Sequence, residues 1–154
     1  MDIQLIDEQD DPLEPKSIVA LAESVLVGER LPPETEVAIK VVDKTAMAVY
    51  NETAMAVAGP TDVLAFPIED AVPGTPPRRS PQGPPVSLGD VVVCPEVVRA
   101  NAQAAGVAFE DELALMVVHG LLHLLGYDHV EDAEAQQMED RERALLEAAG
   151  RVRP

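Results

Sequence analysis

The chain has 154 residues, of which 28 are acidic and 11 basic, giving a formal net charge of −17. This charge repels polyanions at long range and favours a soluble monomer, so any site for nucleic acid must be local. The length fits one domain over residues 1–154, and a 47% hydrophobic content with two Phe, two Tyr and no Trp predicts an aliphatic core.

Apolar residues in the first half of the chain alternate between strand-like and helix-like spacing. Residues 3–6 alternate apolar with polar, whereas Ile18, Leu21 and Val25 recur at helical spacing. The pattern predicts, in order, a strand over 3–6, a helix over 16–26, a strand over 36–42, a helix over 44 to about 54 and a strand over 61–68. Pro67 places the last strand at a sheet edge or marks a strand end, because proline cannot donate to a central ladder.

A proline-dense segment separates the two halves. Over residues 69–87 the prolines, two glycines and the pair Arg78 and Arg79 predict a surface loop. The pattern beyond it predicts a strand over 91–94, a helix over 95 to about 105, a helix over 113–125 that Gly126 ends, and a helix over 132 to about 149 that packs through Met138, Leu145 and Leu146. Together the elements predict an α+β fold with a small mixed four-stranded sheet and about five helices.

Neither a disulfide nor a membrane span is expected. Cys94 is the only cysteine, and its β-branched neighbours predict that it is buried. Residues 113–126 form the most apolar run, which is shorter than a bilayer span and contains two histidines. No export signal is visible before Ile18. We therefore expect a cytoplasmic protein.

All three histidines lie in the stretch HGLLHLLGYDH, residues 119–129. Residues four apart on a helix project from one face, so His119 and His123 can share one ion. Gly126 can end the helix and return the chain, so that His129 offers a third nitrogen. Three histidines leave a tetrahedral zinc one open position for water, which is the catalytic pattern. The alternative, solvated or core histidines, requires this spacing to arise by chance.

The same spacing occurs in the metzincin signature H-E-x-x-H-x-x-G-x-x-H, whose glutamate serves as general base. Here Gly120 occupies the glutamate position. The sequence therefore predicts a metzincin-like zinc helix without that base, which disfavours a peptidase, although water polarised by zinc remains available.

With Gly120 after the first histidine, and with Tyr127 and Asp128 before the last one, the stretch resembles the signature of the YbeY family of endoribonucleases and rRNA maturation factors. GPTDVLAFP at 59–67 and LGDVVVCP at 88–95 are similar to the family's strand motifs. The resemblance covers most of the chain from about residue 37 to 146.

The resemblance implies a single-domain α+β fold and one Zn²⁺ bound by His119, His123 and His129. It also implies cleavage of single-stranded RNA during maturation of the small-subunit 16S rRNA 3′ end, and a part in ribosome quality control. The implied partners are the small ribosomal subunit and its assembly factors.

One departure from the family pattern concerns a cation. The family commonly has an arginine a few residues before the P-T-D motif, whereas equal spacing puts Met55 there. Phosphate binding must then come from zinc or from another arginine. Arg78 and Arg79 are candidates for substrate binding, and the alternative is that they belong to a solvated loop.

Other polar residues near these motifs have open roles. Asp128 is either a hydrogen-bonding partner of a ligand histidine, a proton acceptor or a plain residue of the helix exit. Tyr127 is expected to pack rather than bind substrate, and Asp62 and Asp90 to cap turns or strand ends rather than catalyse. The leading function is a zinc-dependent endoribonuclease, and the alternative is a non-catalytic ribosome assembly factor with a structural zinc.

Overall fold

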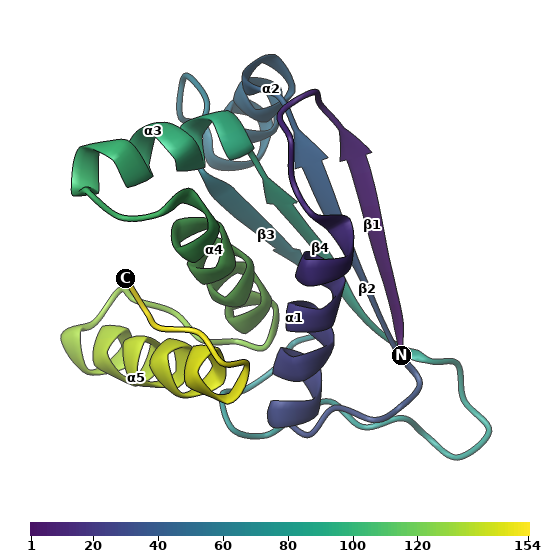
Figure 1. Cartoon of the computed structure of the whole chain (residues 1–154). Coiled ribbons are helices and arrows are strands. Elements are labelled where there is room, and N and C mark those ends of the chain that lie inside the picture. The colour runs from purple at the N-terminus through teal and green to yellow at the C-terminus, as the bar shows by residue number, and fades with distance from the viewer.

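The structure is a computed structural model that describes residues 1–154. Its elements follow the predicted order, and Figure 1 shows how they are arranged. They are β1 (Asp2–Glu8), α1 (Pro15–Gly28), β2 (Thr35–Val42), α2 (Lys44–Met55), β3 (Val63–Pro67), β4 (Val86–Val93), α3 (Pro95–Ala105), α4 (Phe109–Leu124) and α5 (Asp132–Ala148). Four strands and five helices confirm the predicted α+β class.

The strands form one mixed sheet in the order β1-β2-β4-β3. The first three of these strands are parallel neighbours, whereas β3 pairs antiparallel with β4. β3 is therefore an edge strand, and Pro67 is its last residue, as predicted.

The helices cover the two faces of the sheet unequally. Ile39 of β2 and Val91 of β4 belong to the main core cluster with the apolar residues of α1, α4 and α5. Val92 and Cys94 point to the other face, where they form a smaller cluster with Met47 of α2. α1 and α4 thus lie on one face and α2 on the other (Figure 1).

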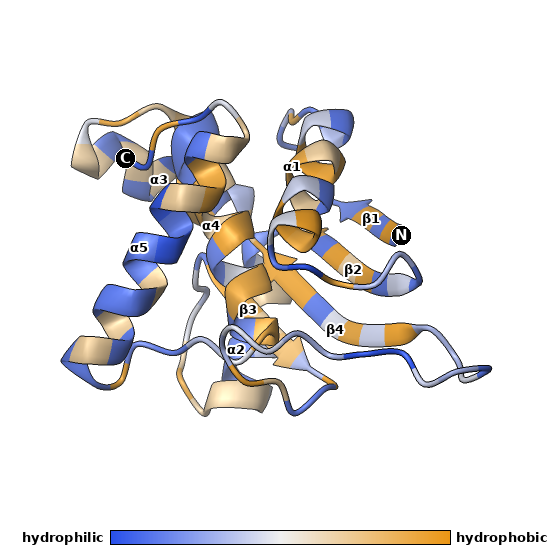
Figure 2. Ribbon diagram, turned by 90° about the horizontal axis from the view of Figure 1, so that it is seen from below, coloured by the Kyte–Doolittle hydropathy of each residue, from blue (hydrophilic) through white to orange (hydrophobic).

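α4 lies at the centre of the main core. It contacts β3, β4 and the other helices α1, α3 and α5. Its residues are apolar on most sides, as the hydropathy colouring in Figure 2 shows. A helix that is hydrophobic nearly all round is stable only when it is buried. Side chains on α4 are therefore held by a rigid element. No helix of the structure is both long and apolar enough to span a bilayer.

The proline-dense segment ends earlier than predicted. β4 begins at Val86, so the last two residues of the predicted loop 69–87 belong to a strand. Val86 pairs with Thr35 and Ser87 with Glu36, and Leu88 is fully buried. The neighbouring prolines indicate a loop, and the strand forms by pairing with β2, which lies far away in the sequence. The local pattern therefore did not predict it. Within the segment, Val72 and Thr75 form an isolated antiparallel bridge.

Candidate metal centre

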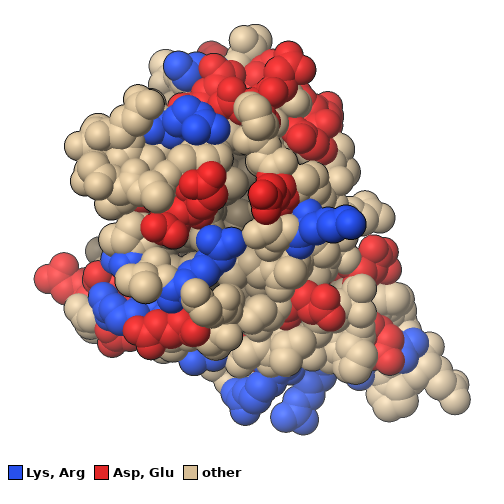
Figure 3. All heavy atoms as spheres, viewed as in Figure 1, with Lys and Arg blue, Asp and Glu red and all other residues tan.

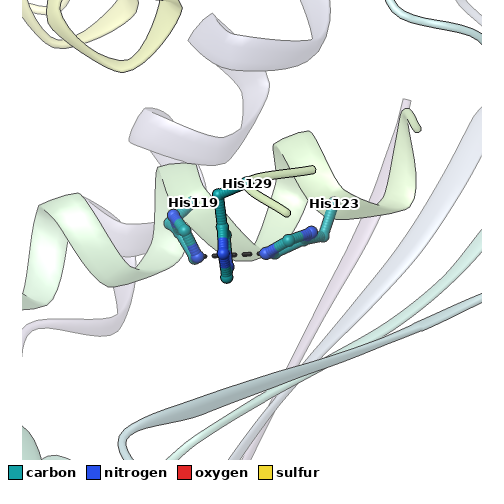
Figure 4. A group of neighbouring side chains, drawn as sticks. All are labelled: His119, His123 and His129. Carbon is teal, nitrogen blue, oxygen red and sulfur yellow. Dashed lines mark hydrogen bonds between the residues drawn. The ribbon is translucent and has the colours of Figure 1, made fainter. Parts of the chain in front are cut away.

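Three histidine side chains converge at the end of α4 (Figure 4). His119 and His123 lie one helical turn apart, and their Nε2 atoms are 3.0 Å from each other. His129 joins them from the segment after the helix, where it is exposed. One ring nitrogen from each residue lies within 4.8 Å of the other two. The sequence-predicted histidines are thus brought together.

The turn at Gly126 returns the chain to the helix. Gly126 has φ +93°, and a Cβ there would lie 2.1 Å from the carbonyl oxygen of Ala71. Glycine is required both for this backbone conformation and for this close approach. The backbone N–H of Tyr127 then donates to the carbonyl of Leu122, and His129 stacks beside His119 with ring centroids 5.4 Å apart. The carbonyl of Ala71, in the segment after β3, therefore lies directly against the turn.

His123 is held by its own loop. Its Nδ1 lies 2.9 Å from the carbonyl oxygen of Tyr127, and a carbonyl can only accept, so the Nδ1 carries the proton. Burial lowers the pKa of His123, and the neighbouring His119 and His129 lower it further. The ring is therefore neutral at neutral pH, with the Nε2 lone pair free.

His119 is held by a residue that sequence reasoning missed. Its Nδ1 lies 2.8 Å from Oε2 of Glu142 on α5, and Glu142 is only 3% exposed. A carboxylate that receives this proton fixes the same tautomer as in His123. A signal was present: Glu142 lies four residues after Met138 and three before Leu145, so the apolar period of α5 places it on the buried face.

The residues present fit a metal ion. Both Nδ1 atoms lie against acceptors, so when both rings are neutral two Nε2 lone pairs face each other at 3.0 Å, an approach that a cation between them relieves. In a tetrahedral zinc site with bond lengths of about 2.0–2.1 Å, two ligand nitrogens lie about 3.3 Å apart. Imidazole nitrogens suit zinc, copper, iron and nickel. The arrangement can therefore hold a divalent transition metal.

Two residues beside the histidines have structural contacts. The Asp128 carboxylate accepts a hydrogen bond from the backbone N–H of His129 at 2.8 Å and contacts no imidazole nitrogen. Tyr127 is buried, and its hydroxyl donates to Glu29 at 3.3 Å. Burial raises the pKa of Tyr127, and Glu29 raises it further. Glu29 also pairs with Arg141 of α5, so this network, which the sequence did not indicate, ties α1 and α5 to the loop of the metal centre.

The arginine candidates lie on the surface. Arg78 and Arg79 are exposed, the Arg79 Nε donates to the carbonyl of Gly83 at 3.0 Å, and no hydrogen bond joins either residue to the histidines. Met55, the last residue of α2, is 58% exposed. Acidic and basic side chains are interspersed on the face shown in Figure 3, without a continuous basic band.

The remaining candidates have roles outside the metal centre. The Asp62 carboxylate accepts from the backbone N–H of Val63 at the start of β3. Asp90 pairs with Lys40 at 3.3 Å, and this hydrogen bond raises the pKa of Lys40. Cys94 is buried, as predicted, and burial raises the pKa of its thiol.

The glutamate position of the metzincin signature has no room for a side chain. A Cβ on Gly120 would lie 2.6 Å from Cγ1 of Val91 and 3.2 Å from Cγ2 of Val63. α4 therefore packs against β3 and β4 with its backbone at this point. A glutamate at this position would require these valines to shift, so the general base of that signature does not fit this packing.

Fold and site together define a class: α+β proteins with a histidine triad that can hold a metal ion, built from a buried helix and its glycine turn. Within that class, the chain belongs to the YbeY family, since the family model described as Endoribonuclease YbeY matches residues 4–150. This match confirms the resemblance seen in the sequence.

Relatives and a solved structure agree with the assignment. A protein named Endoribonuclease YbeY from Nocardioides sp. is 42% identical over 153 residues, covering 99% of this chain and all of the relative. One of the same name from Pseudarthrobacter chlorophenolicus is 40% identical over 146 residues, covering 95% and 91%. The solution structure of TM1509 from Thermotoga maritima superposes with a TM-score of 0.62 at 28% identity, covering 95% of this chain and 87% of that one.

Proposed function

We propose that this chain is an endoribonuclease that cleaves single-stranded RNA with one Zn²⁺ held by His119, His123 and His129. Its relatives are named endoribonucleases, and the facing Nε2 atoms of His119 and His123 are the observation that carries the metal site. We place its action in the cytoplasm, on the 3′ end of the small-subunit rRNA during ribosome maturation and quality control, with the small subunit and its assembly factors as partners.

The donor set favours a catalytic over a structural metal. The cluster offers three ligands from protein side chains, whereas structural zinc sites are closed by four. A bound zinc ion supplies Lewis acidity toward water and a phosphate oxygen. His129 is exposed, so the substrate can approach on its side. The alternative, a ribosome assembly factor with a structural zinc, would need a fourth protein ligand, which the histidine cluster does not offer.

The other residues have supporting parts in this proposal. The carbonyl of Tyr127 and the carboxylate of Glu142 orient His123 and His119 by accepting from their Nδ1 atoms. Asp128 is exposed beside His129, where it can accept a proton from an incoming water. Arg78 and Arg79, on the proline-dense segment, contact RNA phosphates. They supply the positive charge that Met55, at the position of the family's arginine, does not.

Cleavage of a single-stranded RNA oligonucleotide tests the proposal. Zinc-quantified wild type is compared with His119→Ala purified identically, because the inactive variant reports contaminating nucleases. Cutting by the wild type alone, with the duplex form of the same RNA spared, is the expected result. If neither protein cuts although zinc is bound to the wild type, the endoribonuclease proposal fails and the assembly factor takes its place.

A further inference from the structure

A buried carboxylate connects the metal centre with the segment that follows α5. Glu142 Oε2 faces His119 Nδ1 at 2.8 Å, and its Oε1 lies 3.4 Å from both Nε and Nη2 of Arg153. The remaining Nη1 of Arg153 lies 3.3 Å from Oε1 of Glu139. Each oxygen of Glu142 therefore has its own partner, one from α4 and one from the segment after α5. Figure 3 shows the interleaved acidic and basic side chains over α5.

We propose that Glu142 and Arg153 are a positioning pair for the metal centre, in which Arg153 aims the Glu142 carboxylate and Glu142 sets the ring and the donor strength of His119. The inference rests on the metal site of the proposed function.

Burial makes the second partner necessary. A carboxylate that is 3% exposed loses most of its hydration, and such a charge is stable in a protein only when it is paired and hydrogen-bonded. An imidazole that binds a metal is neutral, so His119 as a ligand supplies one hydrogen bond but no compensating charge. The guanidinium of Arg153 supplies that charge, and its planar fork binds Glu139 and Glu142 together, which fixes its own position.

The pair distinguishes the two helical ligands. His123 donates its Nδ1–H to the neutral carbonyl of Tyr127, whereas His119 donates to a negatively charged group. A carboxylate behind an imidazole makes the opposite nitrogen a stronger donor and holds the ring in one orientation. Losing such a partner typically costs 10- to 100-fold in metal affinity. His119 is therefore the ligand whose strength depends on α5.

Zinc affinity of the full chain tests the pair without relying on nuclease activity. Glu142→Gln keeps an oxygen that can accept from His119 but removes the charge, and Arg153→Ala removes only the outer partner. Two controls match them. Glu139→Gln alters a second contact of Arg153 that touches no histidine, and Arg151→Ala removes a nearby guanidinium that instead binds the hydroxyl of Ser17 at 3.0 Å.

Competition with a chromophoric chelator gives the zinc Kd, and the visible spectrum of the cobalt-loaded protein reports the coordination. We expect Glu142→Gln to weaken zinc binding by about 10-fold or more and to shift the cobalt spectrum. Arg153→Ala should weaken it by a smaller factor that Arg153→Lys partly restores. Arg151→Ala should stay within about twofold of wild type because Arg151 contacts neither Glu142 nor a histidine, and Glu139→Gln should do so because its amide oxygen can still accept from Arg153.

Several results would overturn the inference. A folded Glu142→Gln with wild-type zinc affinity would make Glu142 a plain tie between α4 and α5. If Glu142→Gln fails to fold, unchanged affinity in Arg153→Ala overturns the pair by itself. Equal losses in Arg151→Ala and Arg153→Ala would assign the effect to the whole segment. A wild type that binds no zinc overturns the metal centre of the proposed function and the pair with it, whereas a wild type that binds zinc, with unchanged affinity in both variants, overturns the pair alone.

Discussion

The Gly126 turn places His129 beside His119 and His123, and replacing Gly126 with alanine should perturb this turn directly. Holding a residue other than glycine in a sparsely populated backbone region costs about 1–3 kcal/mol. The Cβ would also lie 2.1 Å from the Ala71 carbonyl oxygen, a backbone atom that no rotamer change can move, and overpacking adds about 1–3 kcal/mol. We expect Gly126→Ala to lower the free energy of unfolding by about 2–6 kcal/mol, and the Tm by roughly 5–20 °C.

A second glycine, Gly106, separates the cost of backbone strain from the cost of the steric clash. Gly106 also ends a helix, with φ +71°, but a Cβ there meets nothing within 4 Å. Gly106→Ala should therefore cost only about 1 kcal/mol and leave zinc affinity unchanged. Urea unfolding of the metal-free proteins and a zinc competition titration measure both quantities. Equal stability losses in the two variants, with zinc binding retained in Gly126→Ala, would refute the reasoning that this turn is sterically fixed against residue 71.

Three further outcomes are expected. Zinc affinity should fall as the pH drops through about 6.5, the ordinary imidazole value, because ligand imidazoles must be neutral. Burial lowers the pKa of His123, so the unfolded chain takes up that proton first, and the metal-free protein loses stability as the pH falls from the ordinary value to the lowered one. Zinc retention unchanged in titrations well below that pH would argue against imidazole ligation. Gly120→Ala should cost about 1–3 kcal/mol in urea unfolding because of Val91, and a neutral substitution would show that α4 can shift. Arg78→Ala with Arg79→Ala should weaken RNA binding and flatten its already shallow salt dependence, at unchanged Tm; an unaltered salt slope would leave both as solvated surface residues.

Local patterns were sufficient for much of the fold. The helix over 95–105 was predicted with its observed bounds, because Pro95 and Gly106 mark its two ends in the sequence itself. The glycine turn could be predicted in the same way from residues 119–129. The start of β4 could not, since residues 86–90 become a strand through pairing with β2, about fifty positions earlier.

The contacts around the histidines show the same division. The three rings were predicted to meet because helical spacing and one turn bring them together. Glu142 lies 23 positions from His119, and Glu29 lies 98 positions from Tyr127, so no local pattern connects these pairs. Asp128 was the nearest carboxylate in sequence, but its position in the tight loop turns it toward the backbone N–H of His129. Proximity in sequence was a poor guide to which acid supports a histidine.

The order in which the chain is synthesised gives the Glu142 contact another meaning. All three histidines leave the ribosome before α5 does, yet His119 has its acceptor only after α5 has folded back on α4. Arg141, the neighbour of Glu142, pairs with Glu29, so the packing of α5 also completes the buried network around Tyr127. A nascent chain that holds the histidines but lacks α5 thus carries an unfinished centre. The hydrogen bonding of His119 is therefore complete only after α5 has been synthesised and has packed on α4, later than the synthesis of the three histidines themselves.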